Sequence, residues 1–363
     1  MKNTFGQSVA CTLFGESHGS EIGIVIDGLA PGIDVDEDFI SSQLSLRRPK
    51  GRISTARREA DEYRIVSGVF EGKTTGSAIC ILIPNSDTKS KDYSSTRMLA
   101  RPGHADYSAN CKYHGFEDYR GGGHFSGRIT APLVAAGAIA ISALSKKGIY
   151  IGTHIKECAG VSDVSFTNIA QDIKKLGSME FAVLSEEKAA LMQSAILDAA
   201  NDGDSVGGVL ETAAIGVPAG VGEPWFDSVE SVLSHILFSI PGIKGVQFGL
   251  GFDFATKRGS DANDSFQMEN GKVITKTNNN GGINGGITNG MQIVFSCVVK
   301  PTPTIYKTQQ TVDFINGKDA EITMQGRHDP AIIHRARVVV DSVTALALCD
   351  MLSQRYGTDW LAN

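Results

Sequence analysis

The stretch FGESHG, residues 14–19, decides how the N-terminal part of the chain folds. Gly15 to Gly19 fit G-x-S-x-G, the pattern of a hydrolase nucleophile elbow, in which a helix directly follows the serine. Here residues 8–14 can form a strand, and residues 20–28 are β-branched, interrupted by glycine, and predict a second strand. The stretch is therefore predicted to be the tip of a hairpin-like turn, and the elbow interpretation fails on its context.

Further along the chain, runs bounded by Gly or Pro predict strands at residues 23–29, 63–70, 77–84, 209–217 and 292–299. Apolar periodicity and end signals predict helices at residues 36–46, 133–147, 186–200, 227–239 and 331–355. Strands and helices do not alternate strictly, and the second and third strands suit a hairpin. We therefore expect a mixed, largely antiparallel α+β fold, with residues 1–363 as a single domain because no linker or repeat interrupts them.

The composition is that of a soluble globular protein, with 41% hydrophobic and 20% charged residues among 363. The longest apolar run, residues 132–144, is too short to span a bilayer, and the N-terminus lacks the apolar core of a signal peptide. Six scattered cysteines without a C-x-x-C pair suit reduced thiols better than disulfides or zinc. We expect a cytoplasmic protein with no membrane partner and no metal site.

A formal charge of −6 argues against a nucleic-acid partner. The arginines are nevertheless clumped in three segments, which are Arg47, Arg48, Arg52, Arg57 and Arg58; then Arg97, Arg101, Arg120 and Arg128; then Arg327, Arg335 and Arg337. Single arginines are most often solvated surface residues. Clusters among glycines and histidines on an acidic protein indicate a small polyanionic ligand.

Two glycine-rich patterns fail as dinucleotide motifs. Gly249-Leu250-Gly251 is followed by Phe254 where the third glycine belongs, and the triplet at residues 121–123 is followed by Ser126. Residues 259–290, with five glycines at 281–290, fit either a mobile surface loop or a backbone that approaches a ligand closely.

What remains is a constellation of loop residues that carry chemistry. A lone histidine is usually structural, and Asp329, just before Pro330, also suits the cap of the helix expected after it. The set as a whole predicts phosphate and carboxylate recognition with proton transfer. Its members are Ser17 and His18, His104, Ser126 and Arg128, the run Lys300-Pro301-Thr302-Pro303-Thr304, and the run Arg327-His328-Asp329.

At these residues the chain resembles the chorismate synthase family. Three family signatures appear in order, as GESHG (15–19), RPGHADYSANCKY…DYRGGG (101–123) and GRHDP…RA (326–336). The pattern continues between them in LRRPKGR, SGVFEGKTTG, DSVGG, GVPAGVGEPWFD, SIPGIKGVQFG, GGINGGITNG and KPTPT. The likeness spans nearly the whole chain and is far more specific than one G-x-S-x-G.

The resemblance implies a β-α-β sandwich fold and a homotetramer. It also implies a lyase that makes chorismate from 5-enolpyruvylshikimate 3-phosphate by 1,4-elimination of phosphate, the last step of the shikimate pathway. The family requires reduced FMN, although the reaction has no net redox change, and some members use NADPH to reduce the flavin.

The resemblance also implies roles for individual residues. His18 would protonate the departing phosphate, His104 the reduced flavin near N1, and Asp329 would assist proton removal at flavin N5. The residues implied in substrate binding are Ser17, Arg48, Arg101 and Arg128. Those implied in flavin binding are His124, Phe125, Ser126, Gly242, Gly285, Lys300, Pro301, Thr302, Pro303, Thr304 and Arg327. Arg47 and Arg52 match positions associated with NADP.

The sequence departs from the family in one loop. The family usually has RGGGRSSAR where this chain has RGGGHFSGR, so His124, Phe125 and Gly127 replace Arg, Ser and Ala, and the preceding KYHGFEDYR has one extra residue. A fixed cation and a hydroxyl are lost, and the charge of a histidine depends on pH. Weaker FMN binding is the resulting hypothesis. A non-catalytic flavin- or phosphate-binding relative is the alternative function, and a serine hydrolase acting through Ser17 is a distant third.

Overall fold

The computed structural model describes residues 2–55, 60–86, 97–324 and 328–362. Its N-terminal hairpin consists of β2 (Ala10–Gly15) and β3 (Glu21–Asp27), which pair antiparallel with Gly15 opposite Ile22. Gly15 has a φ of 97°, and a Cβ there would lie 2.6 Å from the carbonyl oxygen of Glu21. The hairpin predicted around FGESHG is confirmed, and the hydrolase elbow is absent because a strand follows the turn.

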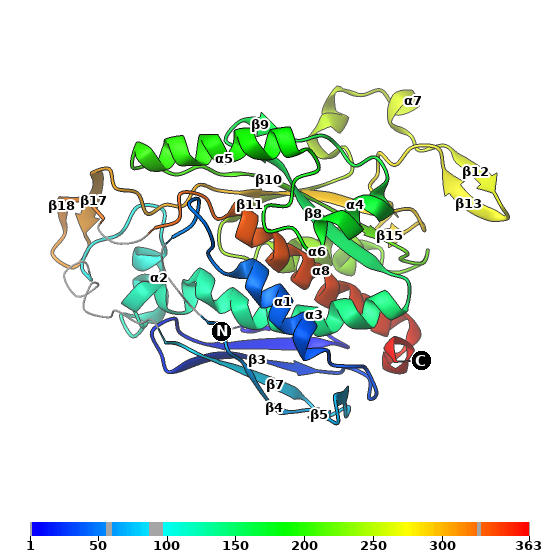
Figure 1. Ribbon diagram of the computed structural model, residues 1–363, viewed down its shortest axis with the longest axis horizontal. Helices are drawn as coiled ribbons and strands as arrows, with labels where there is room; N and C mark the ends of the chain where they lie inside the picture. Colours follow the sequence, from blue (N-terminus) through cyan, green and yellow to red (C-terminus); the bar gives the residue numbers. More distant parts are fainter. Residues whose placement is uncertain (1, 56–59, 87–96, 325–327, 363) are drawn as a thin grey trace.

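Two five-stranded antiparallel sheets form the outer layers of a sandwich (Figure 1). The first has the order β1-β2-β3-β7-β4 and adds β1 (Thr4–Phe5), β4 (Arg64–Ser67) and β7 (Ile79–Pro84) to the hairpin. The predicted pairing of the segments at 63–70 and 77–84 is confirmed, since β4 pairs antiparallel with β7. The connection between them contains β5 (Val69–Phe70) and β6 (Lys73–Thr74).

The second sheet has the order β11-β16-β10-β8-β9, and all its pairs are antiparallel. Its strands are β8 (Tyr150–Cys158), β9 (Val161–Ser162), β10 (Gly208–Ile215), β11 (Ile243–Phe248) and β16 (Ile293–Val299). The central strand β10 is buried over residues 210–214 (LETAA), and it contacts α8 (Ile333–Tyr356) and α4 (Ile169–Leu176).

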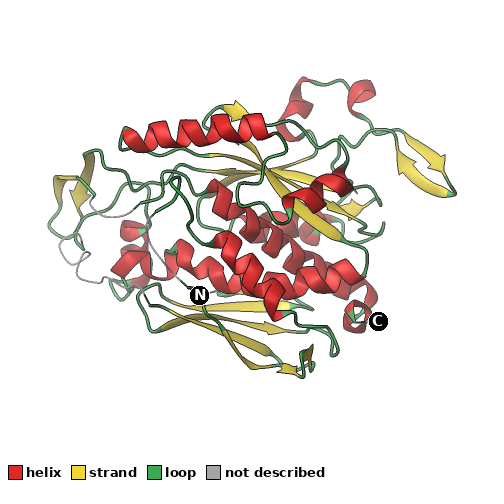
Figure 2. Ribbon diagram, viewed as in Figure 1, coloured by secondary structure: helices red, strands yellow, loops and turns green. Residues whose placement is uncertain are grey.

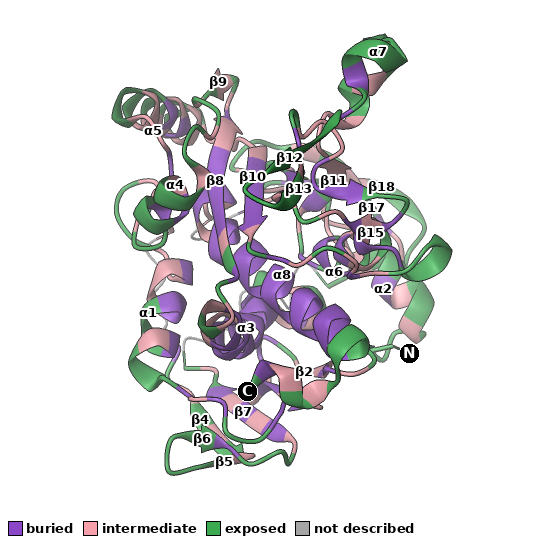
Figure 3. Cartoon of the chain, turned by 90° about the vertical axis from the view of Figure 1, so that its right-hand side faces the viewer, coloured by how far each residue is buried: buried purple, intermediate pink, exposed green. Residues whose placement is uncertain are grey.

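The layer between the sheets is helical. It contains α1 (Glu37–Arg47), α3 (Thr130–Lys146), α6 (Val229–Leu237) and α8 (Ile333–Tyr356). α3 contacts the first sheet, α8 contacts the second, and both helices are largely buried (Figure 3). A Cβ at Gly137 of α3 would lie 2.2 Å from the Cβ of Ser342 in α8, so this close crossing requires glycine. The predicted α+β class is confirmed.

Smaller elements surround the sandwich (Figure 2). The helices are α2 (Asp106–Tyr113), α4 (Ile169–Leu176), α5 (Glu186–Asn201) and α7 (Gly259–Ala262). Short hairpins are formed by β12 (Phe266–Glu269) with β13 (Lys272–Thr275), β14 (Ile283–Asn284) with β15 (Ile287–Thr288), and β17 (Gln309–Asp313) with β18 (Lys318–Ile322). Short 3-10 segments lie at Arg120–Phe125, Gly127–Ile129, Trp225–Asp227, Gly251–Thr256 and Thr358–Leu361, and the first is interrupted by the non-helical glycines 121–123.

The glycine-rich region at 259–290 is not the irregular surface loop that one interpretation of the sequence suggested. It contains α7 and two hairpins instead of an irregular loop. A Cβ at Gly281 would lie 2.6 Å from the backbone nitrogen of Gly249, and one at Gly282 would lie 2.4 Å from the carbonyl oxygen of Gln292. These two glycines therefore allow one backbone segment to pack closely on another.

The apolar core helix is longer than the sequence indicated. Residues Gly127–Lys146 form a helical segment long and apolar enough to cross a membrane, whereas the apolar run at 132–144 suggested one that is too short. Within the protein, 78% of the apolar window is buried. The buried helix α3 separates the two sheets, so the position of this segment is that of a core helix.

Candidate active site

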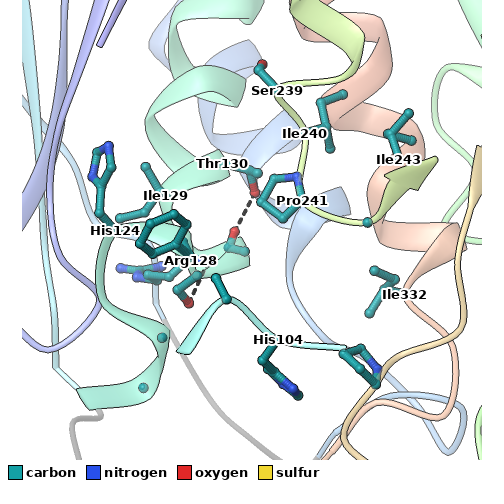
Figure 4. A pocket seen from close by; sticks show the side chains of 18 of the residues that line it. His104, His124, Arg128, Ile129, Thr130, Ser239, Ile240, Pro241, Ile243 and Ile332 are labelled. Carbon is teal, nitrogen blue, oxygen red and sulfur yellow. Dashed lines mark hydrogen bonds between the residues drawn. The ribbon is translucent and has the colours of Figure 1, made fainter. Parts of the chain in front are cut away.

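A cavity of about 1240 Å³ lies between the helical layer and the loops at one end of the sandwich (Figure 4). It is larger than the roughly 300–1,000 Å³ of a typical small-ligand pocket, so two ligands can share it. Most of the predicted site residues line it, namely His18, Arg47, Arg101, His104, His124, Phe125, Ser126, Arg128, Gly242, Lys300, Pro301, Pro303, Thr304 and Asp329.

The remaining predicted residues lie elsewhere. Ser17, Arg48, Arg52, Thr302 and Gly285 do not line the cavity, and Arg52 and Gly285 are exposed. Arg57, Arg58 and Arg327 lie outside the described residues.

The turn that connects β2 to β3 places His18 at the cavity. Ser17 and His18 are 1% and 8% exposed, and the Ser17 Oγ lies 3.3 Å from the His18 Nδ1. The amide of Ser17 donates to the carbonyl of Gly123, at 3.1 Å. Gly121 has a φ of 60°, and a Cβ there would lie 2.0 Å from the Cε1 of His18. The glycine triplet thus leaves the space that the imidazole fills.

His104 lies on the loop before α2 and is held at both ring nitrogens. Its Nδ1 is 3.1 Å from the carbonyl oxygen of Pro102, and its Nε2 is 2.9 Å from the Oγ1 of Thr304. Burial, and then the positive charge of Arg101, lower the pKa of His104 to about 4. Arg101 itself makes a two-pronged pair with Asp106, at 2.8 and 2.7 Å. The ring is therefore neutral at pH 7 in the ligand-free protein.

The two residues that depart from the family pattern have different surroundings. His124 donates from Nδ1 to the carbonyl oxygen of Gly15, at 2.8 Å, and so connects this loop to the end of β2. Phe125 is 42% exposed and meets Tyr113 edge-on, with ring centroids 6.0 Å apart. His124 thus fixes the loop, while much of the Phe125 ring stays uncovered.

A buried carboxylate that the sequence analysis missed organises part of the arginine cluster. Asp61 is 2% exposed and accepts hydrogen bonds from Arg47, at 3.3 Å, and from Arg128. The Nε of Arg48 lies 3.8 Å from the same carboxylate. A single Asp beside an arginine-rich segment gave only a weak signal in the sequence. Because of it, part of the cationic charge expected to meet a ligand is neutralised inside the protein.

Asp329 does not cap the helix that follows it. The cap position of α8 is Ile332, which makes no side-chain cap hydrogen bond, so that alternative is wrong. One carboxylate oxygen accepts the amide of Thr55 at 2.8 Å, and the other accepts from Arg335 at 2.6 Å. Asp329 therefore stands as a fixed carboxylate on the cavity wall.

The run that follows β16 supplies a further cation. Lys300 donates from Nζ to the carbonyl oxygen of Gly103, at 2.7 Å, next to His104. Burial, and then the nearby charge of Lys244, lower the pKa of Lys300. Lys244 also lines the cavity and was missed by the sequence analysis.

Apolar side chains form the opposite wall. Figure 4 shows Ile240, Ile243 and Ile332 across from His124 and Arg128. A flat aromatic ring fits against such a wall, and the cationic groups opposite it suit phosphates and carboxylates. The donor set is thus compatible with a flavin nucleotide and an anionic substrate.

A sandwich with a large cavity that is lined by several histidines, a fixed carboxylate and several cations defines an enzyme for small anionic ligands. A family model described as chorismate synthase matches residues 9–353. Proteins named chorismate synthase are similar over 96% of this chain, at 46% identity from Pyrococcus abyssi (96% of that protein) and 45% from Thermococcus gammatolerans (97%). The chain belongs to the chorismate synthase family, and it is a lyase of that type.

A solved structure supports the same fold. A crystal structure of a chorismate synthase superposes with a TM-score of 0.77 at 29% identity, covering 98% of this chain and 94% of the other. The α+β sandwich with its helical middle layer is therefore the fold of the family.

Proposed function

We propose that the protein eliminates phosphate from 5-enolpyruvylshikimate 3-phosphate in this cavity to give chorismate, with reduced FMN bound beside the substrate. The observation that carries the proposal is the meeting of His18, His104 and Asp329 around a space for two ligands. Family membership supports it, because similar proteins of nearly the same length bear this name.

The cavity lining supports the presence of a flavin. The apolar wall suits the ring system. The residues proposed to hold it are His124, Phe125, Ser126, Gly242, Lys300, Pro301, Pro303, Thr304 and, outside the described residues, Arg327. Thr302 and Gly285 remain proposed contacts although they do not line the cavity of the single chain. When bound, reduced FMN supplies a transient electron that helps the phosphate leave, with no net redox change.

The protein supplies the proton transfers. His18 protonates the departing phosphate as its C–O bond breaks, and Asp329 would assist proton removal at the N5 position of the bound flavin. His104 is neutral without ligands. Next to a negatively charged bound flavin its pKa would be higher, so that His104 could donate a proton near flavin N1. Arg48, Arg101 and Ser17, with Arg128, are proposed to orient the substrate phosphate and carboxylates.

Further parts of the proposal rest on the family likeness and on single observations. We propose a homotetramer with no nucleic-acid or membrane partner, in accord with the family. A cytoplasmic location accords with the family and with the six free cysteines. NADPH as the flavin reductant is proposed to involve Arg47 and Arg52. The whole chain, 1–363, is proposed to act as one domain, because residues from both its first and last hundred positions line the cavity.

The test separates this function from a non-catalytic flavin-binding role. Purified protein is titrated with FMN and then mixed, without oxygen, with substrate and chemically reduced FMN. Flavin binding with chorismate formation supports the lyase. Flavin binding without chorismate formation supports the non-catalytic role. The presence of His18, His104 and Asp329 argues against that role.

A further inference from the structure

We propose that Arg335 is a positioning residue that holds the Asp329 carboxylate in its reactive orientation. This inference rests on the proposed function, in which Asp329 assists the removal of a proton. Arg335 touches neither of the transferred groups in this account and acts only through Asp329. It lies on the cavity wall in the first turn of α8.

The carboxylate of Asp329 is held from two sides. Arg335 donates from Nη1 to Oδ2 at 2.6 Å, and the backbone amide of Thr55 donates to Oδ1 at 2.8 Å. An ionised carboxylate offers about four lone-pair sites. Within the described residues these two donors occupy one site on each oxygen, so each oxygen keeps a site for a proton. The two contacts thus fix the plane of the group without blocking it.

Arg335 is itself fixed by the end of another helix. Its Nε donates to the carbonyl oxygen of Arg47, at 2.8 Å, and Arg47 is the last residue of α1. The last carbonyls of a helix lack partners within the helix, so this bond also satisfies α1. One guanidinium therefore joins the end of α1, the start of α8 and Asp329, and its side chain is only 17% exposed.

Helix stability does not explain a cation at this position. The positive end of the helix dipole lies at the N-terminus, where acidic residues are favoured, yet α8 has none in its first turn and has Arg335 instead. The unfavourable interaction with the dipole is offset by the pair with Asp329. The pair with Asp329 and the hydrogen bond to the carbonyl of Arg47 together account for arginine here.

The test is a double-substitution cycle with Arg335→Gln, Arg335→Lys, Asp329→Asn and the combination of Arg335→Gln with Asp329→Asn. We expect Arg335→Gln to lower kcat about 10- to 100-fold, while KM changes less than about twofold. The reason is that a reacting group displaced by about 1 Å can lower the rate by up to about 100-fold. Arg335→Lys restores part of kcat. In the Asp329→Asn background, Arg335→Gln has little further effect, since its role is exerted through the carboxylate.

The matched control is Lys50→Gln. Lys50 connects the same segment as Thr55 to Glu180 at 2.7 Å, but it does not contact Asp329 or line the cavity. Its loss is expected to leave kcat unchanged. Additive losses in the cycle, or an equal loss from Lys50→Gln, would overturn the proposal, because either result means that Arg335 supports the fold only.

Two further measurements keep the outcomes separate. If Arg335→Gln does not fold, Arg335→Lys takes its place in the cycle, alone and combined with Asp329→Asn. If the wild-type protein makes no chorismate, the proposed function fails. The effect of Arg335 on the Asp329 carboxylate is then tested by infrared spectroscopy of the carboxylate bands of Asp329. A band shift on Arg335→Lys supports it, and unchanged bands contradict it.

Discussion

The Nε2 atom of His104 lies 2.9 Å from the hydroxyl oxygen of Thr304, 200 residues further along the chain. On the other side of the ring, Nδ1 faces the carbonyl oxygen of Pro102, which can only accept. Nδ1 therefore carries the proton, and Nε2 accepts from the Thr304 hydroxyl. The fold thus selects one neutral tautomer of His104 before any ligand arrives.

This arrangement predicts the titration of His104. Burial and the charge of Arg101 disfavour the protonated ring, so its pKa in the ligand-free protein is expected near 4 instead of the ordinary 6.5. NMR of the labelled imidazole as a function of pH measures it directly. A midpoint near 6.5 would show that the ring is not held as described.

A second prediction concerns the contribution of His104 to the rate. His104→Ala is expected to lower the rate by about 10²–10⁴, the range for loss of a general acid. Thr304→Val removes the hydroxyl but keeps the shape, and it is expected to cost less, since the imidazole remains. Steady-state rates with reduced FMN measure both. An unaffected rate in His104→Ala removes this residue from the mechanism.

The glycine triplet gives a third prediction. Gly121→Ala would place a Cβ 2.0 Å from the His18 ring and would also strain a residue with a φ of 60°, so the ring must move and most activity is expected to be lost. The matched control is Gly127→Ala, where a Cβ meets no atom within 4 Å. Comparable rates for the two variants would contradict a role for the triplet in placing His18.

The altered loop gives a fourth prediction. Replacing His124 by Arg and Phe125 by Ser restores a fixed cation and a hydroxyl, and it is expected to lower the dissociation constant for FMN. Fluorescence titration measures the change, with Phe125→Ser alone as the control for exposing the cavity wall. If the dissociation constant of the double variant equals that of the wild type, the hypothesis of weakened flavin binding is wrong.

The burial of His334 leads to a fifth prediction, that the stability of the fold decreases in acid. Burial lowers its pKa from 6.5 to about 4, and its Nε2 is 2.8 Å from the hydroxyl of Ser54. As the pH falls from 6.5 towards 4, the unfolded chain binds the proton first, so stability falls by on the order of 3 kcal/mol. In His334→Gln, denaturant unfolding at pH 7 and 4.5 should show a smaller difference than in the wild type. An equal difference in both proteins would contradict this.

The main architecture could be predicted because its signals are local. Glycine at the FGESHG turn, β-branched runs and helix ends located both hairpins and the long helices. α6 begins at Val229 rather than at 227, because the side chain of Ser228 accepts a hydrogen bond from the amide of Ser231 and caps the helix.

The ion pairs of the site could not be predicted in the same way. Asp61 and Arg128 are 67 residues apart, and the Thr55–Asp329 hydrogen bond spans 274 residues. No local pattern specifies such partners, because the packing of α1, α3 and α8 creates them. The sequence therefore indicated the chemistry of the cavity but not which cations are neutralised within it.

The most direct measurement of the central claim is a single anaerobic turnover. Enzyme with chemically reduced FMN is mixed with 5-enolpyruvylshikimate 3-phosphate, and chorismate, phosphate and the flavin spectrum are followed together. Chorismate and phosphate are expected to appear in a one-to-one ratio, and the flavin is expected to be still reduced at the end. Bound flavin without either product, or phosphate released without chorismate, would contradict it.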